Sequence, residues 1–148
     1  MEFGISFFPN VGPEEKSGQD YWGEELSLVD LCDPLGYTHV RTVEHYFHPY
    51  GGYSPNPIVF LTAASQRTKN ARLVTGAVLP VFNNPLKLAG EIAILDAISG
   101  GRLDVGMARA VKTISATRRW SRFCRRRTFI HSARKVRPSS AAPRNAGT

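Results

Sequence analysis

The chain has 148 residues, with 19 Lys and Arg against 12 Asp and Glu, so its formal net charge is +7. This length predicts one domain of ordinary size, and two cysteines in unlike contexts argue against a disulfide framework or a cysteine-rich metal cluster. No apolar run approaches the roughly 18 residues of a membrane span, and the first residues lack the pattern of a signal peptide. We therefore expect a cytoplasmic protein.

The charge is divided unevenly along the chain. Residues 1–110 hold all 12 acidic residues and 8 of the basic ones, a net charge of −4, whereas residues 111–148 hold the other 11 basic residues and no acid. A strongly basic balance usually indicates a nucleic-acid or other anionic partner, but here that inference applies to the last 38 residues only. We expect a domain over residues 1–110 and a basic, poorly ordered tail over residues 111–148.

Apolar periodicity predicts alternating elements in the first domain. In chain order we expect a strand over 3–8, a helix over 21–35 that Gly36 stops, a strand over 38–43 and a long aromatic loop over 44–57. A helix over 58–68 and a strand over 72–79 follow. Asn83-Asn84-Pro85 then caps a helix, with Pro85 at or near its first turn, that runs to about Ile98 and is ended by Gly100-Gly101. A last strand covers 103–107.

This alternation is typical of parallel βα units. Four such units fill residues 1–110, whereas a (β/α)₈ barrel needs about 250 residues. The predicted fold class is therefore α/β, an incomplete (β/α)₈ TIM barrel of about four units. No Gly-x-Gly-x-x-Gly pattern follows the first strand, so a dinucleotide-binding fold is unsupported.

Candidate chemical groups follow the strands, at the rim where barrel enzymes place their active sites. His45 comes after the second strand and can act as an acid or base near neutral pH. The alternative is a loop histidine held by hydrogen bonds. A metal site at His45 and His48 lacks further ligands at suitable spacing, so we expect no metal.

Two further candidates follow the third and fourth strands. Thr75-Gly76-Ala77 lacks bulk inside a strand that should be packed, which indicates a bulge or the close approach of a flat ligand. Arg109 could bind a phosphate through its planar guanidinium group. Its alternative role is a surface ion pair with Glu91 or Asp104.

Residues 1–110 resemble the N-terminal part of the bacterial luciferase-like flavin monooxygenase family. The resemblance is carried by the opening strand, by Glu44-His45-Tyr46-Phe47 with the loop after it, by the strand and helix start over 72–88, and by the glycine-flanked segment over 96–110. It implies an enzyme that uses reduced FMN and O₂ to oxygenate a small organic substrate. It also implies a separate flavin reductase as the partner that supplies the reduced flavin. A deazaflavin-dependent oxidoreductase is the nearest alternative.

The resemblance also implies roles for single residues. His45 resembles the rim histidine that handles protons near the flavin, and Arg109 resembles the arginine that holds the flavin phosphate. Thr75, Gly76 and Ala77 resemble the bulge, often with a non-prolyl cis peptide, on which the flavin ring rests. Tyr46 replaces the second histidine of the family's usual pair, so a two-histidine role is in doubt.

Three interpretations of residues 111–148 stay open. They are an out-of-frame C-terminus on a truncated product, a basic arm that binds nucleic acid nonspecifically, or a fusion of another kind. In the first case the chain would be impaired or non-catalytic. A four-strand half barrel also leaves strand edges and apolar surface uncovered. We therefore predict that the chain forms homo-oligomers or aggregates and that it binds flavin weakly or not at all.

Overall fold

Strands and helices alternate along the chain as the sequence predicts. The computed structural model describes residues 1–46 and 53–109, and the predicted tail over 111–148 and part of the predicted loop, including His48, lie outside the described residues. The elements are β1 (Gly4–Phe7), α1 (Gly18–Asp30), β2 (His39–Thr42), α2 (Pro57–Ser65), β3 (Arg72–Val78), the 3₁₀ turn η1 (Pro80–Phe82), α3 (Pro85–Ser99) and β4 (Leu103–Met107).

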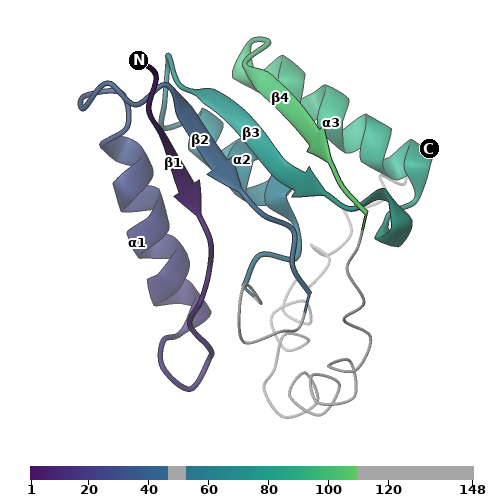
Figure 1. Cartoon of the computed structure of the whole chain (residues 1–148), viewed down its shortest axis with the longest axis horizontal. Helices are drawn as coiled ribbons and strands as arrows, with labels where there is room; N and C mark the ends of the chain where they lie inside the picture. Colours follow the sequence, from purple (N-terminus) through teal and green to yellow (C-terminus); the bar gives the residue numbers. More distant parts are fainter. Residues whose placement is uncertain (47–52, 110–148) are drawn as a thin grey trace, which may run out of the picture. The chain divides into compact units, whose positions relative to one another are not determined.

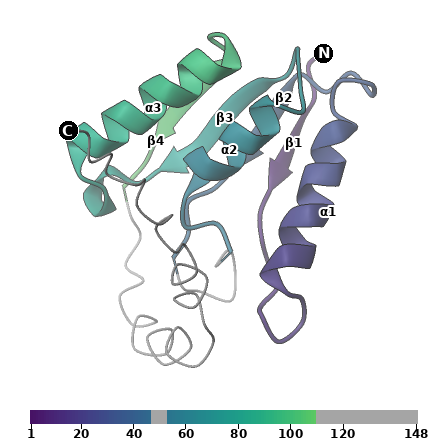
Figure 2. The same ribbon diagram turned by 180° about the vertical axis from the view of Figure 1, so that it is seen from behind.

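The four strands form one parallel sheet in the order β1-β2-β3-β4. Each strand is joined to the next by a helix, and Figure 1 shows the sheet with α2 and α3 behind it. The opposite view in Figure 2 brings these helices in front of the strands, with α1 beside β1. This arrangement of consecutive parallel βα units confirms the predicted α/β fold class.

Asparagine and glycine residues set the helix ends. The side chains of Asn56 and Asn84 accept hydrogen bonds from backbone N–H groups in the first turns of α2 and α3. Gly100 ends α3 with a φ of 69°, which glycine adopts without a steric penalty. The predicted caps of α3, at Asn84 and Gly100, are thus confirmed.

The prediction for α1 was wrong at both ends. The helix begins at Gly18, three residues earlier than predicted, because the hydroxyl of the preceding Ser17 caps it by accepting a hydrogen bond from the Asp20 backbone N–H. The helix ends at Asp30, and the chain continues through turns to Gly36, whose φ is 75°. The carboxylate of Asp33, inside these turns, binds backbone groups near the start of β3 instead of a helix face.

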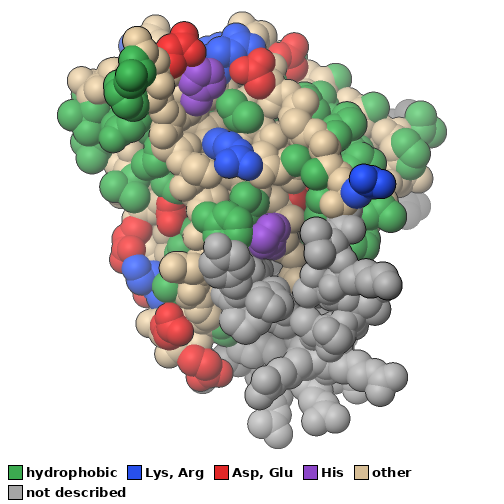
Figure 3. Space-filling view, in the orientation of Figure 1, with side chains coloured by type: hydrophobic (Ala, Val, Ile, Leu, Met, Phe, Trp, Pro, Cys, Tyr) green, Lys and Arg blue, Asp and Glu red, His purple; other side chains and the backbone are tan. Residues whose placement is uncertain are grey.

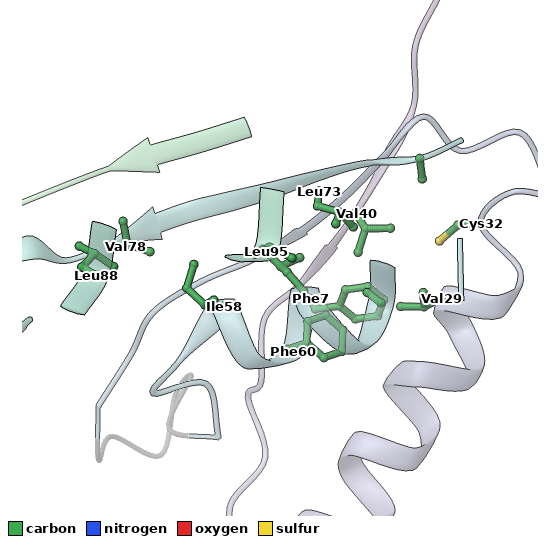
Figure 4. Packing of buried hydrophobic residues seen from close by; sticks show 13 residues of the cluster. Phe7, Val29, Cys32, Val40, Ile58, Phe60, Leu73, Val78, Leu88 and Leu95 are labelled. Atoms are coloured by element: carbon green, nitrogen blue, oxygen red, sulfur yellow. The ribbon is translucent and has the colours of Figure 1, made fainter. Parts of the chain in front are cut away.

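The core lies between the sheet and the helices. Val40, Leu61, Leu73 and Leu95 are fully buried there, and Figure 4 shows side chains from strands and helices meeting in this layer. Burying one such aliphatic side chain stabilises the fold by about 1.5–3 kcal/mol. Successive residues of a strand point to opposite faces of the sheet. The strand residues between the core residues therefore point away from the helices, to a face that we call the open face.

The amino ends of the strands are held by two charged side chains. Arg102 donates hydrogen bonds to the backbone oxygens of Ser65, Thr68, Ala71 and Ser99 at 2.7–3.1 Å and to the Thr68 hydroxyl at 3.0 Å. Asp33 accepts hydrogen bonds from the backbone N–H groups of residues 69–71. These side chains tie the loop between α2 and β3 to both neighbouring segments.

A mostly apolar groove runs between α3 and the edge strand β4. Its lining residues are Pro80, Pro85, Leu88, Ala89, Ile92, Ala93, Asp96, Leu103, Val105 and Met107. Val105 and Met107 are exposed, and β4 has one strand neighbour in the sheet. None of the helices within the described ranges is both long and apolar enough to cross a bilayer.

Candidate functional site

The predicted site residues follow three neighbouring strands. His45 comes three residues after β2, Thr75-Gly76-Ala77 lies within β3 near its end, and Arg109 comes two residues after β4. Because the sheet is parallel and β3 lies between β2 and β4, all of them belong to the carboxyl edge, with the β3 segment in the middle. This is the edge at which open and closed parallel βα sheets bind their ligands.

His45 is held by its backbone and its ring. Its N–H donates a hydrogen bond to the Ser54 carbonyl at 2.8 Å, and its imidazole packs edge-on against the Phe8 ring with centroids 4.9 Å apart. The side chain is half-buried. Phe8 follows β1, so the histidine lies against the carboxyl ends of two strands.

Glu44 fixes the start of the same loop, and the sequence analysis gave it no separate role. Its carboxylate is buried and accepts hydrogen bonds from the Leu79 backbone N–H at 2.7 Å, from the Asn83 side chain at 3.0 Å and from the Tyr46 hydroxyl. Burial and this hydrogen bond to a carboxylate raise the pKa of Tyr46. Glu44 therefore joins the end of β2 to the segment after β3, and Tyr46 is held as a hydrogen-bond donor.

The β3 segment has the irregularity that the sequence predicts. The register between β3 and β4 shifts between Thr75 and Val78, and the Gly76–Ala77 peptide is cis. The Thr75 hydroxyl donates to the Gly106 carbonyl at 3.0 Å and accepts from the Gly106 N–H at 2.8 Å. Thr75 thus joins the two strands at the bulge, with its hydroxyl committed to the backbone of β4.

Two positions at this bulge have no room for a side chain, and both are glycines. A Cβ atom at Gly106 would stand 2.5 Å from the Thr75 carbonyl oxygen, and one at Gly76 would stand 1.9 Å from the Arg41 side chain. Glycine inside a strand often marks the close approach of a ligand or a second backbone. Gly106, also a glycine inside a strand, carries the same sequence signal as Gly76 but was not predicted as a site residue.

Arg109 is exposed beside the bulge. The preceding residue, Ala108, donates its N–H to the Val78 carbonyl at 3.0 Å, which fixes the backbone before the arginine against β3. The two carboxylates that the sequence offers as alternative partners of Arg109 are paired with other cations, Glu91 with Lys87 and Asp104 with Arg72. The guanidinium group is therefore placed at the carboxyl edge without either of those carboxylates.

The open face of the sheet carries charged side chains among apolar ones. Figure 3 shows charged and histidine side chains across the side that the strands present, away from α2 and α3. Arg72 on β3 and Asp104 on β4 form an ion pair there, and Arg41 on β2 reaches the bulge. Arg72 lowers the pKa of Asp104 through this contact.

Within residues 1–46 and 53–109, no group of three or more His, Cys, Asp or Glu side chains is placed to hold a metal ion.

A similar fold occurs in known proteins. The family model for luciferase-like monooxygenases matches residues 1–127, and the chain belongs to this family. The match runs beyond Ala110 into the segment that the sequence separates as a tail, so the domain boundary at residue 110 stays a prediction.

Particular relatives indicate the chemistry of the family. The oxygenase component of the flavin-dependent trigonelline monooxygenase of Acinetobacter baylyi is 34% identical over 109 residues, 74% of this chain and 30% of that protein. The crystal structure of the monooxygenase RslO1 from Streptomyces bottropensis shares 64% identity at a TM-score of 0.73, over 75% of this chain and 34% of that one.

Two further solved structures differ in cofactor. The oxygenating constituent of 3,6-diketocamphane monooxygenase from Pseudomonas putida, in complex with FMN, is 28% identical at a TM-score of 0.70, over 75% of this chain and 30% of that one. The coenzyme F420-dependent tetrahydromethanopterin reductase of Methanopyrus kandleri is also 28% identical, at a TM-score of 0.58, over 81% of this chain and 30% of that one. The chain spans about a third of the length of the relatives it matches.

Proposed function

We propose that the carboxyl edge of this sheet is the FMN site of a luciferase-like monooxygenase, which uses reduced FMN and O₂ to oxygenate a small organic substrate. The observation that carries the proposal is the bulge at Gly76–Ala77, which lies at the carboxyl edge between a half-buried histidine after β2 and an exposed arginine after β4. A flat aromatic ligand needs backbone that it can approach closely, and its phosphate needs a cation.

The residues present fit this cofactor. Arg109 would hold the phosphate, Gly76 and Ala77 would support the ring, and Thr75 would keep the bulge in place through its two hydrogen bonds to Gly106. When bound, reduced FMN supplies the electrons with which O₂ is activated. The protein's task is to hold the ring, exclude water and place a proton donor beside it.

We assign that proton donor to His45. It is half-buried at the edge, and its ring is oriented by Phe8. A positioned acid or base contributes about 10²- to 10⁴-fold to a rate. We expect His45→Gln to slow the reoxidation of bound reduced FMN by air by at least about tenfold, measured by stopped-flow absorbance, while the affinity for FMN stays unchanged. An unchanged rate would remove His45 from the proton-handling role.

The cofactor is testable by thermal unfolding. A ligand that binds the folded state raises the apparent melting temperature. We expect FMN to raise it and coenzyme F420 to leave it unchanged, because F420 is the cofactor of the alternative deazaflavin-dependent class. A larger shift with F420 would favour that class. No shift with either ligand would contradict the proposed flavin site and would match the prediction, made from the sequence, that a half barrel binds flavin weakly or not at all.

The partners follow from the same proposal. One relative is the oxygenase component of its system, and we propose that this chain likewise receives reduced flavin from a separate reductase. We also propose that it self-associates, because the apolar groove beside β4 exposes Val105 and Met107. Such a surface favours association between copies. Sedimentation of the purified chain as a monomer would contradict this part.

A further inference from the structure

Arg41 reaches from β2 across the open face to the bulge. Its Cα is in register with Val74, two residues before Gly76, so the side chain extends along the strand direction toward the carboxyl edge. Its Nη2 donates a hydrogen bond to the Gly76 carbonyl at 2.8 Å. The guanidinium group fills the space that a side chain at residue 76 would take, since a Cβ there would lie 1.9 Å from Nε. The absence of a side chain at Gly76 is therefore what lets this cation touch the bulge.

The charge of Arg41 is not neutralised by the described part of the chain. The arginines at 67 and 72 each pair with an aspartate, Asp30 and Asp104. Arg41 belongs to none of the ion pairs among the described residues, and its hydrogen bond goes to a neutral carbonyl. A guanidinium group has five N–H donors, so its one hydrogen bond to Gly76 leaves donors for a further partner at the bulge.

We propose that Arg41 binds the electron-rich dioxopyrimidine edge of the flavin ring and favours the reduced, anionic form of FMN over the oxidised, neutral form. This inference rests on the proposed flavin site, because it places the ring against Gly76. Arg109 and Arg41 would then divide the cofactor between them, with the phosphate at the end of β4 and the ring edge at β2. A cation beside the ring stabilises its negatively charged state more than its neutral state.

The test compares two redox states of one ligand. The affinities of the full chain for oxidised FMN and for reduced FMN, the latter under anaerobic conditions, are measured for the wild type and for Arg41→Gln. We expect the substitution to weaken the binding of reduced FMN by about ten- to a hundredfold, the range of a charge-assisted hydrogen bond. Binding of oxidised FMN should change by less than about threefold, since the neutral ring gains only an ordinary hydrogen bond.

Two variants separate a charge effect from a structural one. Arg41→Lys keeps the cation and should retain the preference for reduced FMN. Arg67→Gln removes an arginine that pairs with Asp30 between α1 and the segment after α2, and it should leave both affinities unchanged. If Arg41→Gln weakened both redox states equally, Arg41 would only support the bulge, and the proposal would be overturned while the flavin site stood. If the wild type bound neither form, the flavin site itself would fail and this inference with it.

Discussion

The two edges of the sheet use charged side chains in opposite ways. At the amino edge, Arg102 and Asp33 direct their hydrogen bonds at backbone groups of the same domain, and each binds several partners. At the carboxyl edge, Arg109 is exposed and Arg41 makes one hydrogen bond to a neutral carbonyl. The charged groups at the first edge are saturated by backbone partners, whereas the cations at the second have few partners among the described residues.

The comparison shows why residue type alone does not separate structural from functional charges. Arg102 and Arg109 lie at opposite ends of β4, only seven positions apart. In parallel βα folds the amino ends of the strands serve stability and the carboxyl ends carry chemistry. Four predictions test this division, beginning with the largest expected loss of stability.

Arg102→Met should give the largest effect. It removes the donors for four backbone carbonyls and one hydroxyl, and we expect the free energy of unfolding to fall by about 3 kcal/mol. Denaturant unfolding followed by circular dichroism measures the change. Arg67→Met is the matched control, because its exposed pair with Asp30 is worth less than about 1 kcal/mol. An equal fall in the free energy of unfolding of the two variants would contradict the structural role of Arg102 at the amino edge.

Asp33→Asn should lower the free energy of unfolding by about 1.5–3 kcal/mol at neutral pH, since hydrogen bonds to a charged acceptor are lost. Burial alone would raise the pKa of Asp33, but the backbone donors of residues 69–71 outweigh it and hold the pKa below its usual range. Its stabilisation is therefore present above the unfolded pKa and disappears as the pH falls through the folded pKa. Unfolding measured from neutral to acid pH should show a smaller acid-side loss in Asp33→Asn than in the wild type. Parallel pH curves would contradict this account of Asp33.

Thr75→Val should lower the free energy of unfolding by about 1–2 kcal/mol. It keeps the side-chain shape but removes the hydroxyl that binds both backbone groups of Gly106. The loss should be accompanied by weaker FMN binding, since the bulge is what Thr75 holds. Denaturant unfolding and FMN titration on the same samples measure both effects. A stable variant with unchanged FMN affinity would show that the hydroxyl does not position the site.

Arg109→Gln should have the smallest effect on stability, below about 0.5 kcal/mol, as is usual for surface substitutions. A loss as large as that of Arg102→Met would mean that the arginines at both edges are structural. Thermal unfolding of the two variants side by side decides between these outcomes.

The fold was largely predictable because its signals are local. Asn84 and Gly100 carry cap signals that identify the ends of α3, and the predicted strand over 103–107 is the observed β4. The end of α1 was not predictable from local pattern, because Asp33 is recruited by backbone groups more than 30 residues away. The turn at η1 was also missed.

A site residue was predictable where its type is unusual for its position in the sequence. It was less predictable where its position in the site depends on a contact with a residue far away in the sequence. The glycine at position 76 stood out inside a strand, and the bulge there is confirmed. The roles of Glu44 and Arg41 depend on partners about 35 positions away, which only the parallel register brings near. An arginine on the open face of β2 looks like an ordinary solvated charge until its contact with Gly76 is known.

The most direct test of the flavin site is the affinity of the full chain for FMN and for riboflavin, which lacks the phosphate, in the wild type and in Arg109→Gln. If Arg109 holds the phosphate, the substitution should weaken the binding of FMN by about tenfold or more and leave the affinity for riboflavin unchanged. The variant should then bind the two ligands with similar affinity. Equal affinities of the wild type for FMN and riboflavin, or an equal loss of both in Arg109→Gln, would contradict the assignment of this edge as the flavin site.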